Sequence, residues 1–373
     1  MFDDIHHFDT SSWQLLEAVA ADLRQSCLLL TTMRSDDGVL DARKYGAEEE
    51  VHIHKAAVAV LDRLRSLPNV QHIQLPPLTK QEVSEMMQGL LPISGVHDSN
   101  VEVVLQQTRG QPVHVEEISL YIASLGEVAH CSLVEAGGLM SNDLCTLAAG
   151  SISNVVLSRT DTLRPHQQLT LKVCSVLGSN IAPGLLLQTY PLAYENEADM
   201  LERLVEDLHA LCQENFLWQH DSGTQRWYWN TQVARDVVYG MIPFNQRRLL
   251  HARLASALEK SCKLDGVPMS HIAYHWSKSC AGVELVECRR TKKATQCWKL
   301  AAEDMASRGA LLDAIRFMTK SLELTDILLS SSKYEGPAEL SGESFGTMLD
   351  QYMSQQYNFI ARSYLRLIYR HQV

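Results

Sequence analysis

Two adjacent acids near the start of the chain are the first residues that could do chemistry. Asp3 and Asp4 follow Met1 and Phe2, and this short segment has the character of a buried strand that ends in two carboxylates. Carboxylates at a strand end can serve magnesium chemistry, but adjacent acids are also common turn and capping residues. From these residues alone, both interpretations stay open.

A second candidate is a pair of histidines. His271 and His275 are four residues apart, which is the spacing of the two zinc ligands in HExxH proteases. Ile272 stands where that motif has its glutamate, so the protease interpretation fails. A packed helix that places His275 and Trp276 at a helical interface explains the pattern better.

Composition narrows the classes of function. The chain has 373 residues, of which 46% are hydrophobic and 21% charged, enough for two or three packing units. A formal net charge of -11 disfavours binding to nucleic acid and to anionic membranes.

The nine cysteines form no CxxC pair, which argues against zinc ribbons and redox dithiols. No leader or membrane-spanning stretch is evident, so a cytoplasmic location with no membrane span is expected.

The elements that would position the acids alternate between helix and strand. Residues 13–23 and 51–67 have helical periodicity, while 27–32 and 70–75 are short apolar runs typical of buried strands. Pro76 would stop the second strand. This alternation predicts a parallel α/β start to the chain.

The rest of the sequence is predicted to be helical. Thr79 and Glu82 have the spacing of a capping box at the start of one helix. Residues 126–150 are read as a linker. Further helices are expected over 100–108, 113–125, 152–163, 167–177, 183–190, 198–212, 233–241 and 247–260.

One hairpin interrupts these helices. Apolar segments at 216–219 and 226–229 flank Asp221, Ser222 and Gly223, a strong turn signal, and helices followed by a hairpin are the layout of a winged helix. The helices that would meet DNA are rich in acids, so DNA binding is not expected. Residues 294–324 pair two helices with small residues at close spacing, as tetratricopeptide-type hairpins do.

Several motifs, in this order, resemble the signalling (STAND) ATPases of the AAA+ superfamily, particularly those attached to soluble class III adenylyl cyclases. Residues 3–9 resemble the Walker B segment and 28–34 the sensor strand. The remaining segments that carry the resemblance are 75–79, 108–117, 157–163, 168–178, 235–239 and 247–251.

This resemblance implies a mainly α fold with an α/β start. Residues 1–78 would form the second half of a P-loop ATPase core with a partial parallel sheet, and 79–150 a helical lid and linker. Residues 151–250 would form a winged-helix-like domain, and 251–373 TPR-like helical hairpins.

The resemblance also implies a nucleotide site. Asp3 would hold Mg²⁺ through water, and Asp4 would orient the attacking water. Thr32 and Arg34 would sense the terminal phosphate, and Pro112 would lie against the adenine. The cofactors implied for the complete protein are therefore ATP or ADP with Mg²⁺.

Three departures from the family pattern bear on this site. The chain has no GxxxxGK[ST] loop, so we expect it to bind little or no ATP alone. Without the P-loop strand, the two predicted strands would expose apolar faces and unpaired edges. Asp4 stands where many relatives have glutamate, and Thr231 stands where relatives often have a histidine that contacts the nucleotide.

The function implied is a nucleotide-dependent regulatory module that controls an attached cyclase in cAMP signalling, without catalysis of its own. Its expected partners are an upstream P-loop, the cyclase domains and proteins bound by the helical repeats. The alternative is a non-catalytic helical-repeat scaffold that carries a degenerate ATPase remnant.

Overall fold

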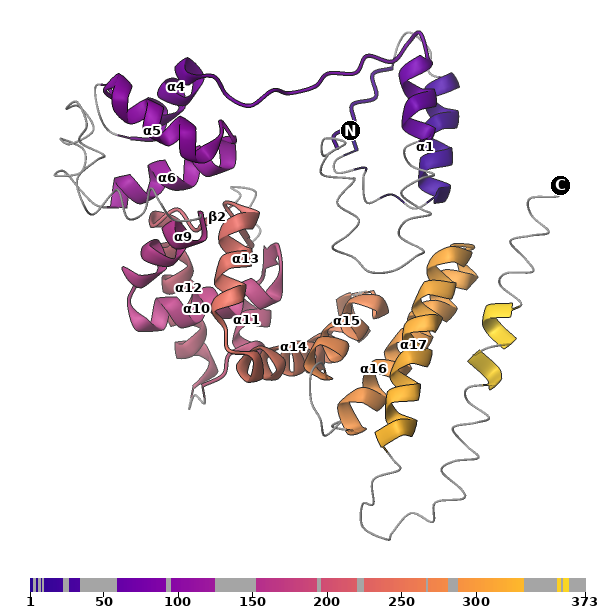
Figure 1. Ribbon diagram of the computed structural model, residues 1–373. Coiled ribbons are helices and arrows are strands. Elements are labelled where there is room, and N and C mark those ends of the chain that lie inside the picture. The colour runs from indigo at the N-terminus through magenta and orange to yellow at the C-terminus, as the bar shows by residue number, and fades with distance from the viewer. Residues whose placement is uncertain are drawn as a thin grey trace. The chain divides into compact units, whose positions relative to one another are not determined.

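A computed structural model shows that the protein is mainly helical, and it divides the chain into two units (Figure 1), Met1–Pro77 and Leu78–Val373. The described residues are 1–2, 5, 8, 10–22, 27–33, 59–91, 95–124, 152–192, 196–219, 225–265, 268–280, 288–331, 354–356 and 358–361.

The first unit is built around two helical segments. Helix α1 (Thr10–Asp22) and a helical stretch at residues 59–66 bury one apolar face each, as their sequence periodicity predicts. Arg63 and Glu17 join the two segments by two parallel hydrogen bonds between guanidinium and carboxylate. Their shared core consists of Ile5, Trp13, Leu16, Ala20, Val60, Leu61 and Leu64.

The strand predicted over residues 70–75 is wrong. These residues have no regular secondary structure, and the side chains of Ile73 and Leu75 are 69% and 87% exposed. A strand forms only against a partner backbone, and no described residue pairs with this segment. The strand predicted over 27–32 is reduced to one parallel bridge between Thr31 and Phe2. Leu28 in this segment is 91% exposed, so each of the two segments has an uncovered apolar residue.

The second unit opens with three short helices, α4 (Lys80–Leu90), α5 (Asp98–Thr108) and α6 (Pro112–Ser124). The capping box predicted before α4 is confirmed: the Thr79 side chain accepts from the backbone of Glu82, and the Glu82 carboxylate accepts from the backbone N–H of Thr79. The buried residues of these helices form one cluster, here called the α4–α6 core, made of Val83, Met87, Leu91, Val101, Val104, Val115, Tyr121 and Ile122 with Val155.

Replacing Thr79 by alanine should weaken α4 by about 1 kcal/mol, because an N-cap acceptor and one half of the capping box are lost. Hydrogen exchange of the α4 amides measures this change. Thr79→Ser keeps the hydroxyl and serves as the control. Equal exchange in the two variants would show that the hydroxyl does not hold the helix start.

The next part of the unit surrounds a small antiparallel sheet. It contains helices α9 (Ile152–Asp161), α10 (Pro165–Leu177), α11 (Pro183–Thr189) and α12 (Glu197–Gln213), followed by α13 (Gln232–Met241). The predicted hairpin is confirmed as β2 (Leu217–Gln219) paired with β3 (Trp227–Trp229). Strand β1 (Asn180–Ile181) was not predicted, because two residues are too few to show an alternating pattern. It pairs with β3, which gives the sheet order β1-β3-β2.

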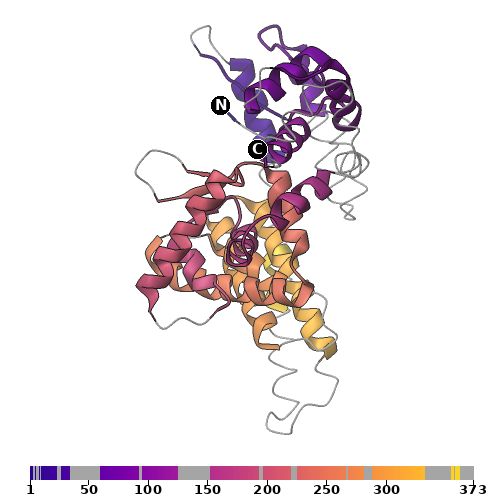
Figure 2. The ribbon, with the colours of Figure 1, turned by 90° about the vertical axis from the view of Figure 1, so that its left-hand side faces the viewer.

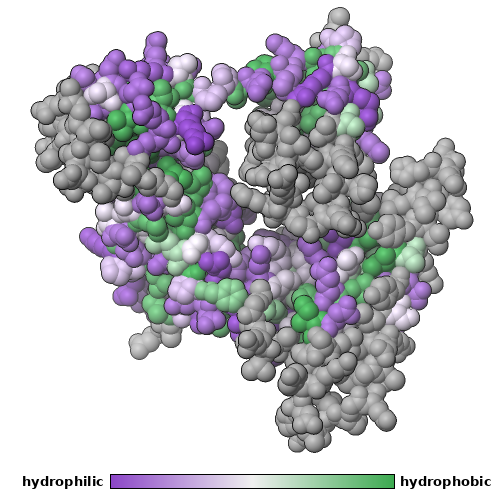
Figure 3. All heavy atoms as spheres, in the orientation of Figure 1, coloured by the Kyte–Doolittle hydropathy of each residue, from purple (hydrophilic) through white to green (hydrophobic). Residues whose placement is uncertain are grey.

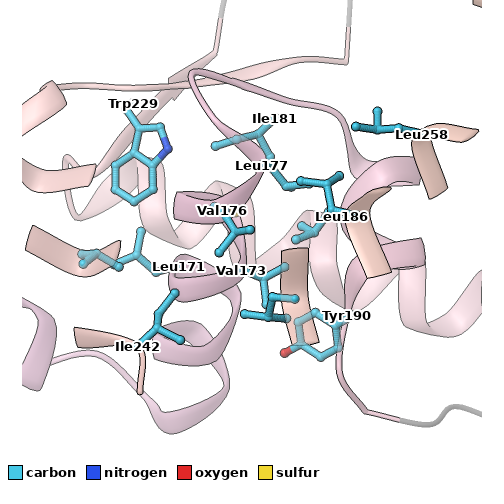
Figure 4. Packing of buried hydrophobic residues seen from close by; sticks show 14 of the residues in the cluster. Leu171, Val173, Val176, Leu177, Ile181, Leu186, Tyr190, Trp229, Ile242 and Leu258 are labelled. Atoms are coloured by element: carbon cyan, nitrogen blue, oxygen red, sulfur yellow. The ribbon is translucent and has the colours of Figure 1, made fainter. Parts of the chain in front are cut away.

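A large hydrophobic cluster, here called the main core, lies between these elements. Figure 4 shows side chains from α10, β1, α11, β3 and α14 that converge on it, among them Leu171, Val176, Ile181, Leu186 and Trp229. Burial of this apolar surface is the main source of stability for the unit. The cluster extends from Val156 on α9 as far as Ala301.

The last part of the unit is a row of helices, α14 (Phe244–Asp265), α15 (Met269–Cys280), α16 (Cys288–Ser307) and α17 (Leu311–Ser331). Each packs on the next helix in the chain, which can be followed in Figures 1 and 2. Helix α14 runs without a break across the domain boundary predicted between residues 250 and 251. Hydrophobic side chains visible at the surface lie in small patches among hydrophilic ones (Figure 3).

Candidate functional site

The backbone of Thr32 is hydrogen-bonded to the residues on both sides of the acidic pair, Asp3 and Asp4. Its backbone N–H donates to the carbonyl of Phe2 at 3.0 Å, and its carbonyl accepts from the N–H of Ile5 at 2.9 Å. Phe2 and Ile5 are the residues that flank Asp3 and Asp4 in the sequence. Phe2 and Ile5 therefore lie beside Thr32, and the bridge between Phe2 and Thr31 is parallel. Asp3, Asp4 and Arg34 themselves lie outside the described residues.

Pro112 is the first residue of α6, where the fixed proline ring suits the first helical turn. The chain reaches it through two consecutive left-handed residues, Arg109 and Gly110, with φ of 50° and 69°. The carbonyl of Gly110 accepts from the N–H of Leu78 at 2.8 Å, which joins this turn to the start of the unit. Pro112 is exposed. It belongs to the second unit, whereas Thr32 belongs to the first.

Five residues after Pro112, helix α6 carries a buried carboxylate that the sequence analysis did not single out. Glu117 is 1% exposed. Arg159 of α9 donates to one of its carboxylate oxygens through Nη1, and the hydroxyl of Thr231 donates to the other. Thr231 also accepts from the N–H of Ala234, so it caps α13. One carboxylate therefore joins α6, α9 and the start of α13.

Arg159 has further partners that satisfy its guanidinium. Its Nη2 donates to the carbonyl of Glu214 at 3.0 Å and to that of Asn215 at 3.3 Å. The guanidinium lies over the ring of Phe216, 4.5 Å from its centroid. Burial lowers the pKa of Arg159, while the charge of Glu117 and its hydrogen bond act in the opposite direction. Arginine remains protonated in proteins, so the guanidinium is the counter-charge of Glu117.

A second hydrogen bond joins the residues that precede Glu117 and Thr231 in the sequence. The side-chain amide of Asn230 donates to the Glu116 carboxylate at 3.4 Å. Burial raises the pKa of Glu116, the neighbouring charge of Glu117 raises it further, and Arg159 lowers it. The adjacent residues Glu116 and Glu117 thus meet the adjacent residues Asn230 and Thr231.

This geometry changes the interpretation of Thr231. The resemblance implied that Thr231 stands where cyclase-linked ATPases often carry a histidine that contacts the nucleotide. In the structure its hydroxyl is used internally, by Glu117 and by the cap of α13. One sequence feature could have indicated this contact. Glu117 and Arg159 are oppositely charged residues, each among apolar residues of its own helix. That signal does not say that the two charges meet.

The histidines of α14 and α15 form a chain of contacts. The Tyr239 hydroxyl lies 2.8 Å from Nε2 of His251, whose Nδ1 lies 2.8 Å from Nδ1 of His275. Nε2 of His275 is 3.4 Å from Nε2 of His271. The predicted packing of His275 and Trp276 at a helical interface is confirmed, since both are buried. Within the described part of the chain, no group of three or more histidine, cysteine, aspartate or glutamate residues could hold a metal ion.

No protein-family model matches this chain, and no curated protein matches it either. The resemblance of its motifs to cyclase-linked ATPases therefore stays a prediction. Among the residues that the structure describes, no helix has the length and apolar character needed to cross a membrane.

Proposed function

We propose that this chain is a nucleotide-dependent regulatory module of a soluble adenylate cyclase-like protein in the cytoplasm. In this proposal the complete protein binds ATP or ADP with Mg²⁺, and the nucleotide state determines how the ATPase core, the lid and the domains after it pack. The readout passes to an attached cyclase domain in cAMP signalling. The module itself carries out no cyclase reaction.

The observation that carries this proposal is the pair of backbone hydrogen bonds at Thr32. They hold Phe2 and Ile5 beside Thr32, and the bridge between Phe2 and Thr31 is parallel. In open parallel sheets, ligands bind beyond the carboxyl ends of the strands. Asp3 and Asp4 come directly after Phe2 in the sequence, and Arg34 comes two residues after Thr32. Acids for magnesium and an arginine for phosphate would then share one edge, as phosphoryl-transfer sites require.

The arrangement of the second unit supports a switch rather than an isolated nucleotide site. Helix α6 begins at Pro112, the proposed adenine contact, and its next turns carry Glu117, which touches α9 and the start of α13. The order of α10, β1, α11, α12, β2 and β3, with sheet order β1-β3-β2, is the layout expected of a winged helix. A change at the start of α6 could therefore reach the winged helix through one rigid helix.

The test compares Mg²⁺·ATP binding by this chain and by a chain extended upstream to include a P-loop. We expect little binding by the chain alone and clear binding by the extended chain. Asp3→Asn should weaken binding in the extended chain, because the carboxylate that holds Mg²⁺ through water is lost. Asp62→Asn, at an exposed acid of the helical stretch 59–66, is the matched control and should bind as the parent does. Equal binding by the Asp3→Asn and Asp62→Asn variants would remove the support for this site.

A second candidate function is favoured by the packing of the last helices. Helices α14 to α17 form a row, and Gln356, in the helical segment after them, donates to the hydroxyl of Ser321 on α17. A row of stacked TPR-like hairpins offers a surface for protein partners. Absence of a P-loop from the upstream coding sequence would favour this inert scaffold over the switch.

A further inference from the structure

The contact between α6 and α13 joins two separate hydrophobic cores. The α4–α6 core and the main core divide at α9, where Val155 belongs to the first and Val156 to the second. Beyond α9, hydrogen bonds join Glu116 and Glu117 of α6 to Asn230 and Thr231 at the start of α13. Two apolar bodies are thus linked by one shared helix and a polar contact.

The free energy needed to open a polar contact of this kind differs from that needed to open an apolar interface. A buried ion pair gains little net stability over apolar side chains of similar volume, because both charges lose their hydration when the contact closes. When it opens, water can solvate the carboxylates and the guanidinium again. The same contact is specific, since a carboxylate needs its donors at defined positions.

We infer that Glu116 and Glu117 on α6, together with Asn230 and Thr231 before α13, form a clasp that closes on Arg159 and can open. The state of the clasp determines whether α6 is held against the start of α13. A role for the clasp in nucleotide switching rests on the proposed function, whereas its opening does not. It is a device of the fold that needs no bound nucleotide.

Substitutions at Thr231 separate the clasp from the helix cap that the same residue provides. Aspartate and asparagine are nearly isosteric, and both are strong N-cap residues, so α13 stays capped in either variant. In Thr231→Asp, a second carboxylate faces Glu117, and like charges brought together at an interface repel strongly. In Thr231→Asn, the side-chain amide can still donate to Glu117. Both variants therefore keep the N-cap of α13, and they differ in the charge that faces Glu117.

The experiment measures hydrogen exchange of the full chain by mass spectrometry, without nucleotide. In Thr231→Asp, we expect the amides of α6 and of the Val155 end of α9 to exchange about tenfold faster or more than in Thr231→Asn. The amides of α10 to α12, in the main core, should exchange equally in both variants. Equal exchange of α6 in the two variants would overturn the inference. Equally increased exchange throughout α10 to α12 would also overturn it, because general unfolding would explain the result.

A charge exchange provides an independent check. In the double variant Glu117→Gln with Thr231→Asp, one carboxylate again faces one neutral side chain near Arg159, so the repulsion is removed. Protection of α6 should recover at least partly toward that of Thr231→Asn. No recovery would contradict the clasp. Failure of ATP to bind to the chain extended upstream would count against the proposed function and would leave these exchange results unchanged, so the two failures are distinguishable.

Discussion

Replacing Arg159 by alanine is expected to lower the free energy of unfolding of the second unit by about 3–5 kcal/mol. The substitution leaves the buried carboxylate of Glu117 without its counter-charge, and removing one partner of a buried ion pair typically costs this much. It also leaves the carbonyls of Glu214 and Asn215 without their donor and removes the guanidinium from the ring of Phe216. Urea unfolding monitored by tryptophan fluorescence measures the effect.

Two controls separate the charge effect from loss of side-chain volume. Arg308→Ala removes an exposed arginine that lies just after α16 and pairs with Asp304 in the last turn of that helix, and it should change stability by less than about 1 kcal/mol. Arg159→Ala combined with Glu117→Gln removes both charges, so this double variant should be less destabilised than the sum of the two single variants. Additive losses would mean that Glu117 does not depend on Arg159.

Acidification should destabilise the region of α13, α14 and α15 as the pH falls below about 6.5. Burial, reinforced by Lys278 and Arg247, lowers the pKa of His251 to about 4. Burial, reinforced by His251, His271 and Arg235, lowers the pKa of His275 to about 2. Both histidines are therefore neutral when folded, in a pH range where the unfolded chain takes up protons.

The sign of the effect follows from proton linkage. Between pH 6.5 and the folded pKa of each histidine, the unfolded state binds more protons, so stability falls with pH by up to about 1.4 kcal/mol per unit and histidine. From pH 7 to 4.5, the loss should reach roughly 2–3 kcal/mol for each of the two. Below its folded pKa, a histidine causes no further loss. Urea unfolding at several pH values between 7.5 and 4.5 measures this slope.

The contribution of His275 is isolated by His275→Gln, whose stability should fall less steeply over the same range. His72→Gln, at an exposed histidine of the first unit, is the matched control and should keep the parent slope. If the slope of His275→Gln equals that of the parent, His275 is not a source of the acid sensitivity. The hydrogen-bonded chain from Tyr239 to His271 would then have only a packing role.

Local features were predictable wherever a few neighbouring residues determine the structure. The Thr79 capping box needs only Thr79 and Glu82, three residues apart, and the structure contains it. The hairpin needs a turn signal between two apolar segments, and β2 and β3 pair as expected. The predicted strand at residues 70–75 failed because a strand also needs a partner backbone, which its own sequence cannot supply.

The candidate site shows the same division. The acids were chosen because they end a short apolar segment, and Thr32 because its segment resembles a sensor strand, whereas the bonds from Thr32 to Phe2 and Ile5 required the structure. Glu117 and Thr231 are 114 residues apart, and neither residue type indicates the other. Which residue accepts the Thr231 hydroxyl depends on where α6 lies relative to α13.

By itself, the sequence determined the mainly helical character of the chain, most helix positions and the hairpin, because periodicity, caps and turn residues act over a few neighbours. Only the tertiary structure decided that one buried carboxylate joins three elements and that three histidines form a chain of contacts. These pairings depend on which helix faces meet, and a buried charge selects whichever partner that packing brings within hydrogen-bonding distance.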